Sequence, residues 1–384
     1  MPESKNPARR YGAAPLTIQR VEAIPMKLPL KKPILMGGGQ RYEHSESLIV
    51  RIEATNGLVG WGEASAAPTM TGDTLAGMVA ALDLHLAPRL IGRDAMERAR
   101  LERELALTMI GNTGAKAACD LALYDLVGRH LNVSMTELLG GALRDSVRTM
   151  YLLGNSNIEQ DVAEAKALAR QGYKFYKLKV GVKPVEEEIA AAFAVRSVIG
   201  PEPILCADAN MGLSMDHARK YVRGVADAGL TFLEQPFRDT DLAGTLTLAR
   251  MSPIPLCADE SAHSLENIID WQRAGAIAGV NLKTIKLGGT AATMRAAIVS
   301  DTLGLAIDLA SKIAESSIAS AGVIHLGYTV PNLDWGLSPT SHYLSEDVVR
   351  HPLAPKDGSS ERPTGPGLGV EVDERAVRRL RAKL

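Results

Sequence analysis

A chain of 384 residues that is 46% hydrophobic and 23% charged can bury large cores, so its composition predicts an ordinary globular protein of about two domains. Its formal net charge of −1 provides no general field for nucleic acid or an acidic membrane surface, and neither is expected as a partner. No stretch approaches the ~18 uninterrupted apolar residues of a membrane span, and residues 1–15 lack the apolar region of a signal peptide, so we expect a cytoplasmic protein with a flexible N-terminus.

The first structured region is expected over residues 16–145. Short stretches in which apolar and polar residues alternate, with a turn at Asn56-Gly57, are typical of an antiparallel sheet. Helical periodicity follows over residues 74–138, and we expect breaks at Pro88 and Gly111. Strands followed by helices predict an α+β domain.

A glycine-rich segment at residues 36–40 interrupts the strands of this region. It lacks the GxGxxG order of a phosphate-binding loop, and no helical pattern follows it. A plain hairpin turn is one interpretation, but a loop that covers a substrate is favoured. We therefore expect specificity to lie in the loops at 34–42 and 64–73, with Met36 as a substrate-binding residue.

The next region, residues 146–345, alternates short apolar runs with helical patterns. The run at 175–180, for example, precedes a helical pattern at 184–198. Seven or eight such units predict a parallel (β/α) barrel. Residues 346–384 are rich in Pro and Gly and end in a predicted helix at 374–383.

Charged residues end the apolar runs of this barrel once per unit. They recur at intervals of 24–29 residues, about the length of one strand and one helix with their loops. Because the carboxyl ends of parallel barrel strands meet at one mouth, these charges should share one cavity. They are Lys179, Asp208, Glu234, Asp259 and Lys283.

Three carboxylates end consecutive predicted strands, at Asp208, Glu234 and Asp259. Neighbouring strands are ~4.8 Å apart, so the three side chains would be lateral neighbours. Hard oxygen ligands in such a cluster suit Mg²⁺ and, less selectively, Mn²⁺. Capping of the following helices by Asp208 and Asp259 is the alternative interpretation, but the regular spacing of all three favours a metal site.

Lysines stand on both sides of this cluster. Lys177 and Lys179 are two residues apart on one strand, so they share a face. Inside a barrel they would crowd each other and lower at least one pKa, as a general base requires, whereas an edge strand would leave both solvated. Lys283 could approach a substrate from the opposite side of the mouth, while Lys286 is expected at the surface.

Together these segments resemble the enolase superfamily, and within it the muconate lactonizing enzyme subgroup of the mandelate racemase/muconate lactonizing enzyme family. The resemblance covers nearly the whole chain. It implies a modified (β/α)7β TIM barrel with an N-terminal α+β capping domain, which the C-terminal segment completes, and a homo-oligomer acting on a small carboxylate substrate. The matching motifs are Gly60-Trp61-Gly62-Glu63, Gly111 through Asp125, Leu139-Gly140-Gly141, Lys177-Leu178-Lys179, Asp208-Ala209-Asn210, Glu234-Gln235-Pro236, Ala258-Asp259-Glu260 and Lys283 through Gly289.

The resemblance implies Mg²⁺-dependent transfer of a proton next to a carboxylate, through an enolate. Lys179 would be the acid or base on one face, Lys177 would assist it, and Lys283 would act from the second face or as a stabilising cation. Glu315 matches the family's segment after the seventh strand and would be a further catalytic residue, and Asn210 would contact substrate. The implied metal ligands are Asp208, Glu234 and Asp259.

Two positions favour a pair of lysines as the acid and base groups. Racemase and sugar-acid dehydratase relatives end the seventh strand with a His, which an Asp on the sixth strand supports. Here the sixth strand ends in Lys283, the seventh ends in residues 310–312, and His325 falls in the following helix. Lys312 also departs from the Gly-Gly that relatives carry, and it would add a substrate-binding cation.

Three functions stay open from the sequence. A muconate-type cycloisomerase is favoured. The second is a racemase or epimerase of N-substituted amino acids or dipeptides that uses the same lysines, or a hydroxy-acid dehydratase. Residues 332–336 supply only one Asp where dipeptide epimerases show a pair, which weakens the dipeptide assignment. The third, a non-catalytic metal-stabilised scaffold, is disfavoured by the intact lysines and carboxylates.

Overall fold

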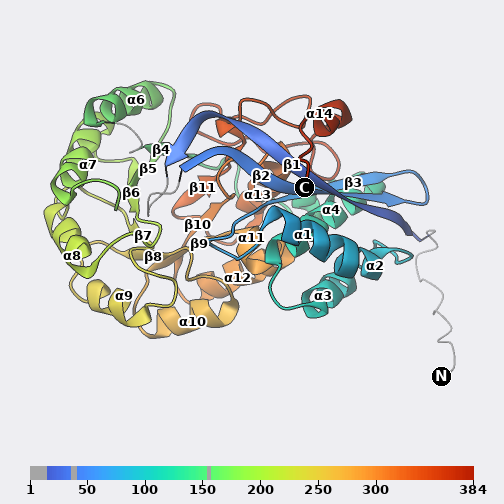
Figure 1. Cartoon of the computed structure of the whole chain (residues 1–384). Helices are drawn as coiled ribbons and strands as arrows, with labels where there is room; N and C mark the ends of the chain where they lie inside the picture. The colour runs from blue at the N-terminus through green and yellow to red at the C-terminus, as the bar shows by residue number, and fades with distance from the viewer. Residues whose placement is uncertain (1–14, 36–40, 154–156) are drawn as a thin grey trace.

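The computed structural model describes residues 15–35, 41–153 and 157–384, and Figure 1 shows their arrangement. The chain begins with a three-stranded antiparallel sheet in the order β1-β2-β3. Gly57 adopts a φ of 82° in the turn between the second and third strands, as the Asn56-Gly57 pair predicts. Met36 and the 36–40 loop lie outside the described residues. The strands are β1 (Ile18–Leu35), β2 (Arg41–Ala54) and β3 (Val59–Ser65).

The helices of the cap follow this sheet. They are α1 (Leu75–Ala81), the π-helical turn η2 (Leu82–Leu86), α2 (Ala87–Leu90), α3 (Arg98–Thr108), α4 (Thr113–Leu131) and α5 (Met135–Leu138). The predicted break at Pro88 is wrong, because helical structure continues without interruption from residue 75 to residue 90. Pro88 follows the π-helical turn and occupies the first turn of α2, where the missing N–H is tolerated. The chain leaves the helix only after Leu90.

Helix α4 lies directly against β3, and two glycines permit this approach. A Cβ atom on Gly62 would lie 2.0 Å from the carbonyl oxygen of Ala118, and one on Gly60 would lie 2.4 Å from that of Ala122. Any larger residue at either position would force the strand and the helix apart. The Gly-Trp-Gly pattern of β3 is therefore a packing requirement of the cap.

The second region is an eight-stranded parallel sheet whose strands follow one another in chain order. A parallel bridge between Thr149 and Leu337 brings its first and last strands together, so the sheet forms a barrel. The strands are β4 (Met150–Leu153), β5 (Phe175–Lys179), β6 (Ile204–Asp208), β7 (Leu233–Glu234), β8 (Leu256–Ala258), β9 (Gly279–Leu282), β10 (Ala306–Ala310) and β11 (Gly336–Ser338).

Seven helical connections join these eight strands within the described chain, which confirms the (β/α)7β architecture. Helices α6 to α10 lie around the outside of the barrel, and β1 and β2 reach across from the cap (Figure 1). The connecting helices are α6 (Ile158–Arg170), α7 (Val185–Ile199), α8 (Met215–Gly224), α9 (Leu242–Ala249), α10 (Leu265–Arg273), α11 (Thr284–Leu287) with α12 (Thr290–Thr302), and α13 (Ser317–Thr329).

The C-terminal segment returns to the cap after the short helix η3 (Ser341–Tyr343). Its final helix, α14 (Glu374–Arg379), is shorter than the predicted 374–383. Beyond it, the backbone N–H of Ala382 donates to the carbonyl of Pro25 at 2.8 Å, and Lys27 donates to Leu380 at 3.1 Å. These contacts support a segment at 346–384 that packs on the cap. Within the residues described, no helix combines the length and apolarity that a bilayer span demands.

Candidate active site

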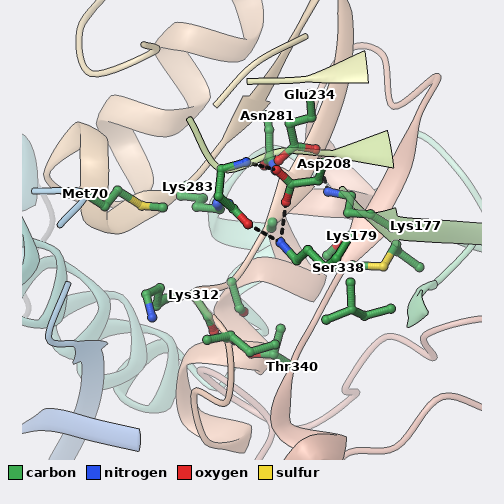
Figure 2. Close-up of a pocket in the computed structure, with 16 residues that line it drawn as sticks. Met70, Lys177, Lys179, Asp208, Glu234, Asn281, Lys283, Lys312, Ser338 and Thr340 are labelled. Carbon is green, nitrogen blue, oxygen red and sulfur yellow. Dashed lines mark hydrogen bonds and ion pairs between the residues drawn. The ribbon is translucent and has the colours of Figure 1, made fainter. Parts of the chain in front are cut away.

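A polar cavity opens at the carboxyl ends of the barrel strands (Figure 2). Alternate side chains of each strand point into the barrel, so residues two apart, such as Lys177 and Lys179, both reach it. Met70 reaches the same cavity from the cap. The polar residues that line it are Lys177, Lys179, Asp208, Asn210, Glu234, Asn281, Lys283, Ser311, Lys312, Ser338 and Thr340.

Lys177 lies deepest, between two carboxylates. Its ammonium is 2.6 Å from Glu234 and 3.3 Å from Asp308. Burial alone would lower the pKa of Lys177, but the charges of Glu234 and Asp308 raise it well above its ordinary value. The expected lowering of the pKa is therefore wrong for Lys177, because the charges of the two carboxylates outweigh the effect of burial. This residue stays charged and fixes Glu234.

Lys179 lies nearer the mouth and contacts Asp208 at 2.6 Å. It also donates a hydrogen bond to the side-chain oxygen of Asn210. Asn210 has a left-handed backbone, its N–H donates to Asp208 at 2.9 Å, and its side-chain amide donates to Glu260 at 3.2 Å. The loop after β6 therefore holds the Lys179 ammonium at the end of its strand.

Lys283 stands on the opposite side of the cavity and forms an ion pair with Asp259. It follows β9, four strands from β5, which carries Lys179, in a barrel of eight. The two ammonium groups therefore approach the cavity from opposite walls. Asp259 is fully buried and does not line the cavity in this conformation.

The prediction that Lys286 lies at the surface is wrong. Its side chain is fully buried and donates to Asp259 at 2.7 Å and to the carbonyl of Asn281 at 2.7 Å. The chain turns into α11 directly after Lys283, so Lys283 and Lys286 are three residues apart in a helical turn and face the same way. That i,i+3 spacing is the signal that could have placed Lys286 in the site.

The three carboxylates expected to bind metal lie on adjacent strands. Glu234 accepts from the amide of Asn281 at 2.9 Å, and burial raises its pKa to about 7 against the influence of Lys177. Burial would also raise the pKa of Asp208 and Asp259, but Lys179 and Lys283, respectively, lead the opposing charges that lower both. Each of the three carboxylates thus carries an ammonium partner.

This donor set suits a hard divalent cation in its chemistry, because it consists of carboxylate oxygens at one edge of a sheet. Among the residues whose positions are described, no three His, Cys, Asp or Glu side chains are grouped as metal ligands in this conformation. The ammonium groups of the lysines contact the carboxylate oxygens instead. A metal at this site would have to displace ammonium contacts from Asp208, Glu234 and Asp259.

Three polar residues of the site were not anticipated. Asn281 lies two residues before Lys283, and Asp308 lies two residues before Ala310 at the end of β10, so both point into the barrel, a spacing that could have revealed them. Glu260 supports Asn210, and burial raises its pKa to about 8. One oxygen each of Asn281, Asp308 and Glu260 is buried without a hydrogen-bond partner.

Glu315 lies behind the cavity wall and does not line it. Its carboxylate accepts from the backbone N–H of Ser65 at 3.0 Å and of Lys312 at 3.1 Å. Burial, followed by the charge of Glu63, raises the pKa of Glu315 to about 8. Glu315 is therefore placed to hold the segment after β10 against the cap. Its side chain does not reach the cavity.

Comparisons with known proteins agree with this geometry over nearly the whole chain. Residues 19–140 match the family described as "Mandelate racemase / muconate lactonizing enzyme, N-terminal domain", and residues 160–376 match "Enolase C-terminal domain-like". The chain is 30% identical over 377 residues to muconate cycloisomerase 1-1 of Acinetobacter lwoffii, covering 95% of this chain and 96% of that protein. It is 30% identical over 367 residues to muconate cycloisomerase 1 of Rhodococcus opacus, covering 94% and 98%.

Solved structures give the same result. The muconate lactonizing enzyme of Pseudomonas fluorescens complexed with muconolactone superposes with a TM-score of 0.91 at 27% identity, covering 96% of this chain and 100% of that one. The 2-chloromuconate cycloisomerase of Rhodococcus opacus 1CP gives a TM-score of 0.90 at 29% identity, with coverage of 96% and 100%.

Proposed function

Because this chain belongs to the mandelate racemase/muconate lactonizing enzyme family of the enolase superfamily, and is an isomerase, we propose that it closes a muconate-type dicarboxylate into a lactone. The observation that carries the proposal is the opposed pair of Lys179 and Lys283 above buried carboxylates. Relatives named muconate and chloromuconate cycloisomerases support the substrate class.

In this reaction one carboxylate oxygen adds to the diene and forms the C–O bond of the lactone ring. The electron pair of the double bond moves to the carbon next to the other carboxylate, giving an enolate. That carbon then takes one proton, which we assign to Lys179, and the ring is complete. Lys283, on the opposite wall, places a second positive charge beside the enolate.

We further propose that Asp208, Glu234 and Asp259 hold Mg²⁺, for which Mn²⁺ could substitute. When bound, such an ion would offset the negative charge that develops on the substrate carboxylate. Lys177 keeps Glu234 oriented through the 2.6 Å contact and stays out of proton transfer. Asn210 keeps Lys179 at the mouth, and Glu315 positions the segment that carries Lys312.

A racemase or epimerase of N-substituted amino acids is the second candidate. It is favoured by one observation: two lysines on opposite walls could each serve one face of the same carbon. A racemase needs both Lys179 and Lys283 to transfer protons, whereas the proposed cycloisomerase needs proton transfer from Lys179 alone.

The test is to incubate the protein with cis,cis-muconate and Mg²⁺ in D₂O. Loss of the diene absorbance together with one deuterium in the lactone would support the cycloisomerase, and chelation of the metal should stop both signals reversibly. The matched arm replaces muconate with N-acyl amino acids. If α-deuterium exchange occurs only in that arm and muconate is unchanged, the racemase assignment replaces the cycloisomerase.

A further inference from the structure

Lys312 differs from every other lysine that lines the cavity. Lys177, Lys179 and Lys283 each contact a carboxylate, whereas the described residues offer the Lys312 ammonium no such ion pair. Lys312 is only 7% exposed, and its ammonium lies 4.6 Å from the centre of the Tyr42 ring. In Figure 2 the dashed contacts gather near Asp208, while Lys312 lies apart from them. A buried ammonium without an anion is costly, so this position favours an incoming anion.

Two hydroxyl groups that line the same cavity as Lys312 also lack hydrogen-bond partners among the described residues. Ser311 is 5% exposed and Ser338 is 2% exposed, both line the cavity, and within residues 15–35, 41–153 and 157–384 neither side-chain oxygen has a hydrogen-bond partner. The ends of β10 and β11 bring them close, since the backbone N–H of Ser311 donates to the carbonyl of Ser338 at 3.0 Å. Buried hydroxyls are normally hydrogen-bonded, so two unpartnered ones in the same wall are an independent sign of a missing ligand.

The acidic side chains near Lys312 have other roles. Glu315 accepts the backbone N–H of Lys312, and Glu43 and Glu46, in the wall of an adjoining cavity of ≈ 220 Å³, pair with Arg41 and His44, respectively. Lys312 lines both cavities, so it stands where the active-site cavity widens toward the cap. A substrate that extends from the carboxylate cluster toward the cap would meet it.

We propose that Lys312, Ser311 and Ser338 form a subsite for the second carboxylate of the substrate. A carboxylate accepts about four hydrogen bonds, and one ammonium with two hydroxyls supplies matching donors. This inference rests on the proposed function and deepens it, because it restricts the substrate to a dicarboxylate with one acid group at each end. It also disfavours N-alkylated amino acids, whose positive charge would approach Lys312.

The experiment measures binding and needs no turnover. Adipate and hexanoate have the same six-carbon length and differ in one carboxylate, so their affinities are compared by calorimetry in Mg²⁺-containing buffer. We expect the wild type to prefer adipate by about 10- to 100-fold, as one charge-assisted contact with supporting hydroxyls provides. Lys312→Met should reduce this preference to about threefold or less, Lys312→Arg should retain most of it, and Ser311→Ala and Ser338→Ala should each reduce it severalfold.

Two variants serve as matched controls. Ser300→Ala removes a hydroxyl that is also fully buried and unpartnered but lies on α12, outside the cavity. Lys32→Met removes a lysine from the exposed part of β1. Both should keep the wild-type preference. If wild type binds adipate no better than hexanoate, or if Lys312→Met keeps the preference, the subsite is overturned.

The subsite and the proposed reaction can fail independently of each other, and the measurements distinguish the two failures. A protein that prefers adipate but leaves muconate unchanged keeps the subsite and loses the cycloisomerase assignment. A protein that lactonizes muconate while Lys312→Met lowers kcat/KM for muconate and for its monomethyl ester equally keeps the reaction and loses the subsite.

Discussion

Buried carboxylates occur in two regions of this molecule, and they have different partners. At the barrel mouth, Asp208, Glu234 and Asp259 contact the ammonium groups of lysine side chains. At the junction between cap and barrel, Glu63 accepts from the backbone N–H groups of Ser316 at 3.0 Å and Ala319 at 3.2 Å. The same type of side chain thus has mobile partners in one region and fixed partners in the other.

A second acid at the junction has the same kind of partner. Asp120 on α4 accepts from the N–H of Thr290 at 2.6 Å, at the start of α12. Asp125, between the cap and the C-terminal segment, accepts from the backbone N–H of Trp61 at 2.9 Å and of Leu368 at 2.8 Å, but it also pairs with the side chain of Arg129 at 2.9 Å. Glu63 and Asp120 therefore neutralise the amino ends of two barrel helices, where unpaired N–H groups and the helix dipole favour negative charge.

The two kinds of partner determine what each region can do. An ammonium side chain can rotate away and leave its carboxylate to another cation, whereas a backbone N–H at a helix end cannot. The mouth is therefore suited to exchange partners when metal and substrate enter. The junction is suited to hold the cap in one position above the mouth. Substitutions should lower activity in the first region and stability in the second.

The largest expected effect is at Glu234. Glu234→Gln should reduce turnover of muconate by roughly a thousandfold or more, because it removes a proposed metal ligand. The fold should persist, since Lys177 keeps Asp308 at 3.3 Å. Activity and melting temperature are measured on the same preparation. If Glu234→Gln lowers the melting temperature but keeps the specific activity, the barrel mouth serves stability and the proposed division between the two regions is wrong.

The two lysines come next. If the chain is a cycloisomerase, Lys179→Ala should lower both ring closure and deuterium incorporation by about 10²- to 10⁴-fold. Lys283→Ala should slow ring closure less and leave its stereochemical preference unchanged. In a racemase, each variant would still exchange the α-proton of one enantiomer. Near-wild-type exchange in both variants would show that neither lysine transfers a proton.

At the junction, Glu63→Ala should lower the free energy of unfolding by roughly 3–5 kcal/mol, because it leaves two buried backbone N–H groups without an acceptor and opens a cavity. The denaturation midpoint in urea measures this. Glu63→Gln, which keeps the volume and one acceptor, should cost less. A loss of activity at unchanged stability would contradict the structural role.

The smallest effect concerns the buried His325, with the half-buried His342 for comparison. His325 contacts Thr136 at 2.7 Å and the carbonyl of Leu368 at 3.2 Å, and burial lowers its pKa to about 4. Between pH 6.5 and 4 the unfolded chain therefore binds a proton that the folded chain does not. The free energy of unfolding should fall as the pH is lowered through this range, by at most about 3 kcal/mol from this residue.

His325→Gln should flatten that part of the stability profile. At neutral pH it should also destabilise the protein more than His342→Gln does, since neither ring nitrogen of His342 has a hydrogen-bond partner. Equal losses at neutral pH would show that the contacts of His325 contribute nothing. Urea titrations at pH 4, 5, 6 and 7 measure both effects.

Much of the architecture and most of the charged site followed from spacing alone. The period of two in strands and the shared mouth of a barrel suffice to bring Lys179, Asp208 and Glu234 together. Lys286 and Asp308 could have been placed by the same kind of argument, but only with the exact ends of β9 and β10 and the start of α11, which the sequence pattern does not fix. The helix α11 begins at Thr284, two residues after the last residue of β9, and β10 ends at Ala310.

Other differences between the sequence predictions and the structure also arise from local backbone geometry. A general rule places Pro88 at a helix break, but the preceding π-helical turn accommodates it. Glu315 follows the seventh strand as expected, yet backbone N–H groups hold it behind the wall. The lack of an ion pair at Lys312 within the described part of the chain depends on everything that surrounds it, so only the assembled structure reveals it.

The return of the C-terminal segment to β1 has a consequence for synthesis of the protein. Lys27 and Leu380 are hydrogen-bonded across almost the full length of the chain. A ribosome that has made the N-terminal sheet must therefore still complete the barrel before the outer strand of that sheet gains these partners. Contacts between such distant residues also slow folding. Nascent chains should expose the β1 edge to chaperones until residues 380–382 have been synthesised and have emerged.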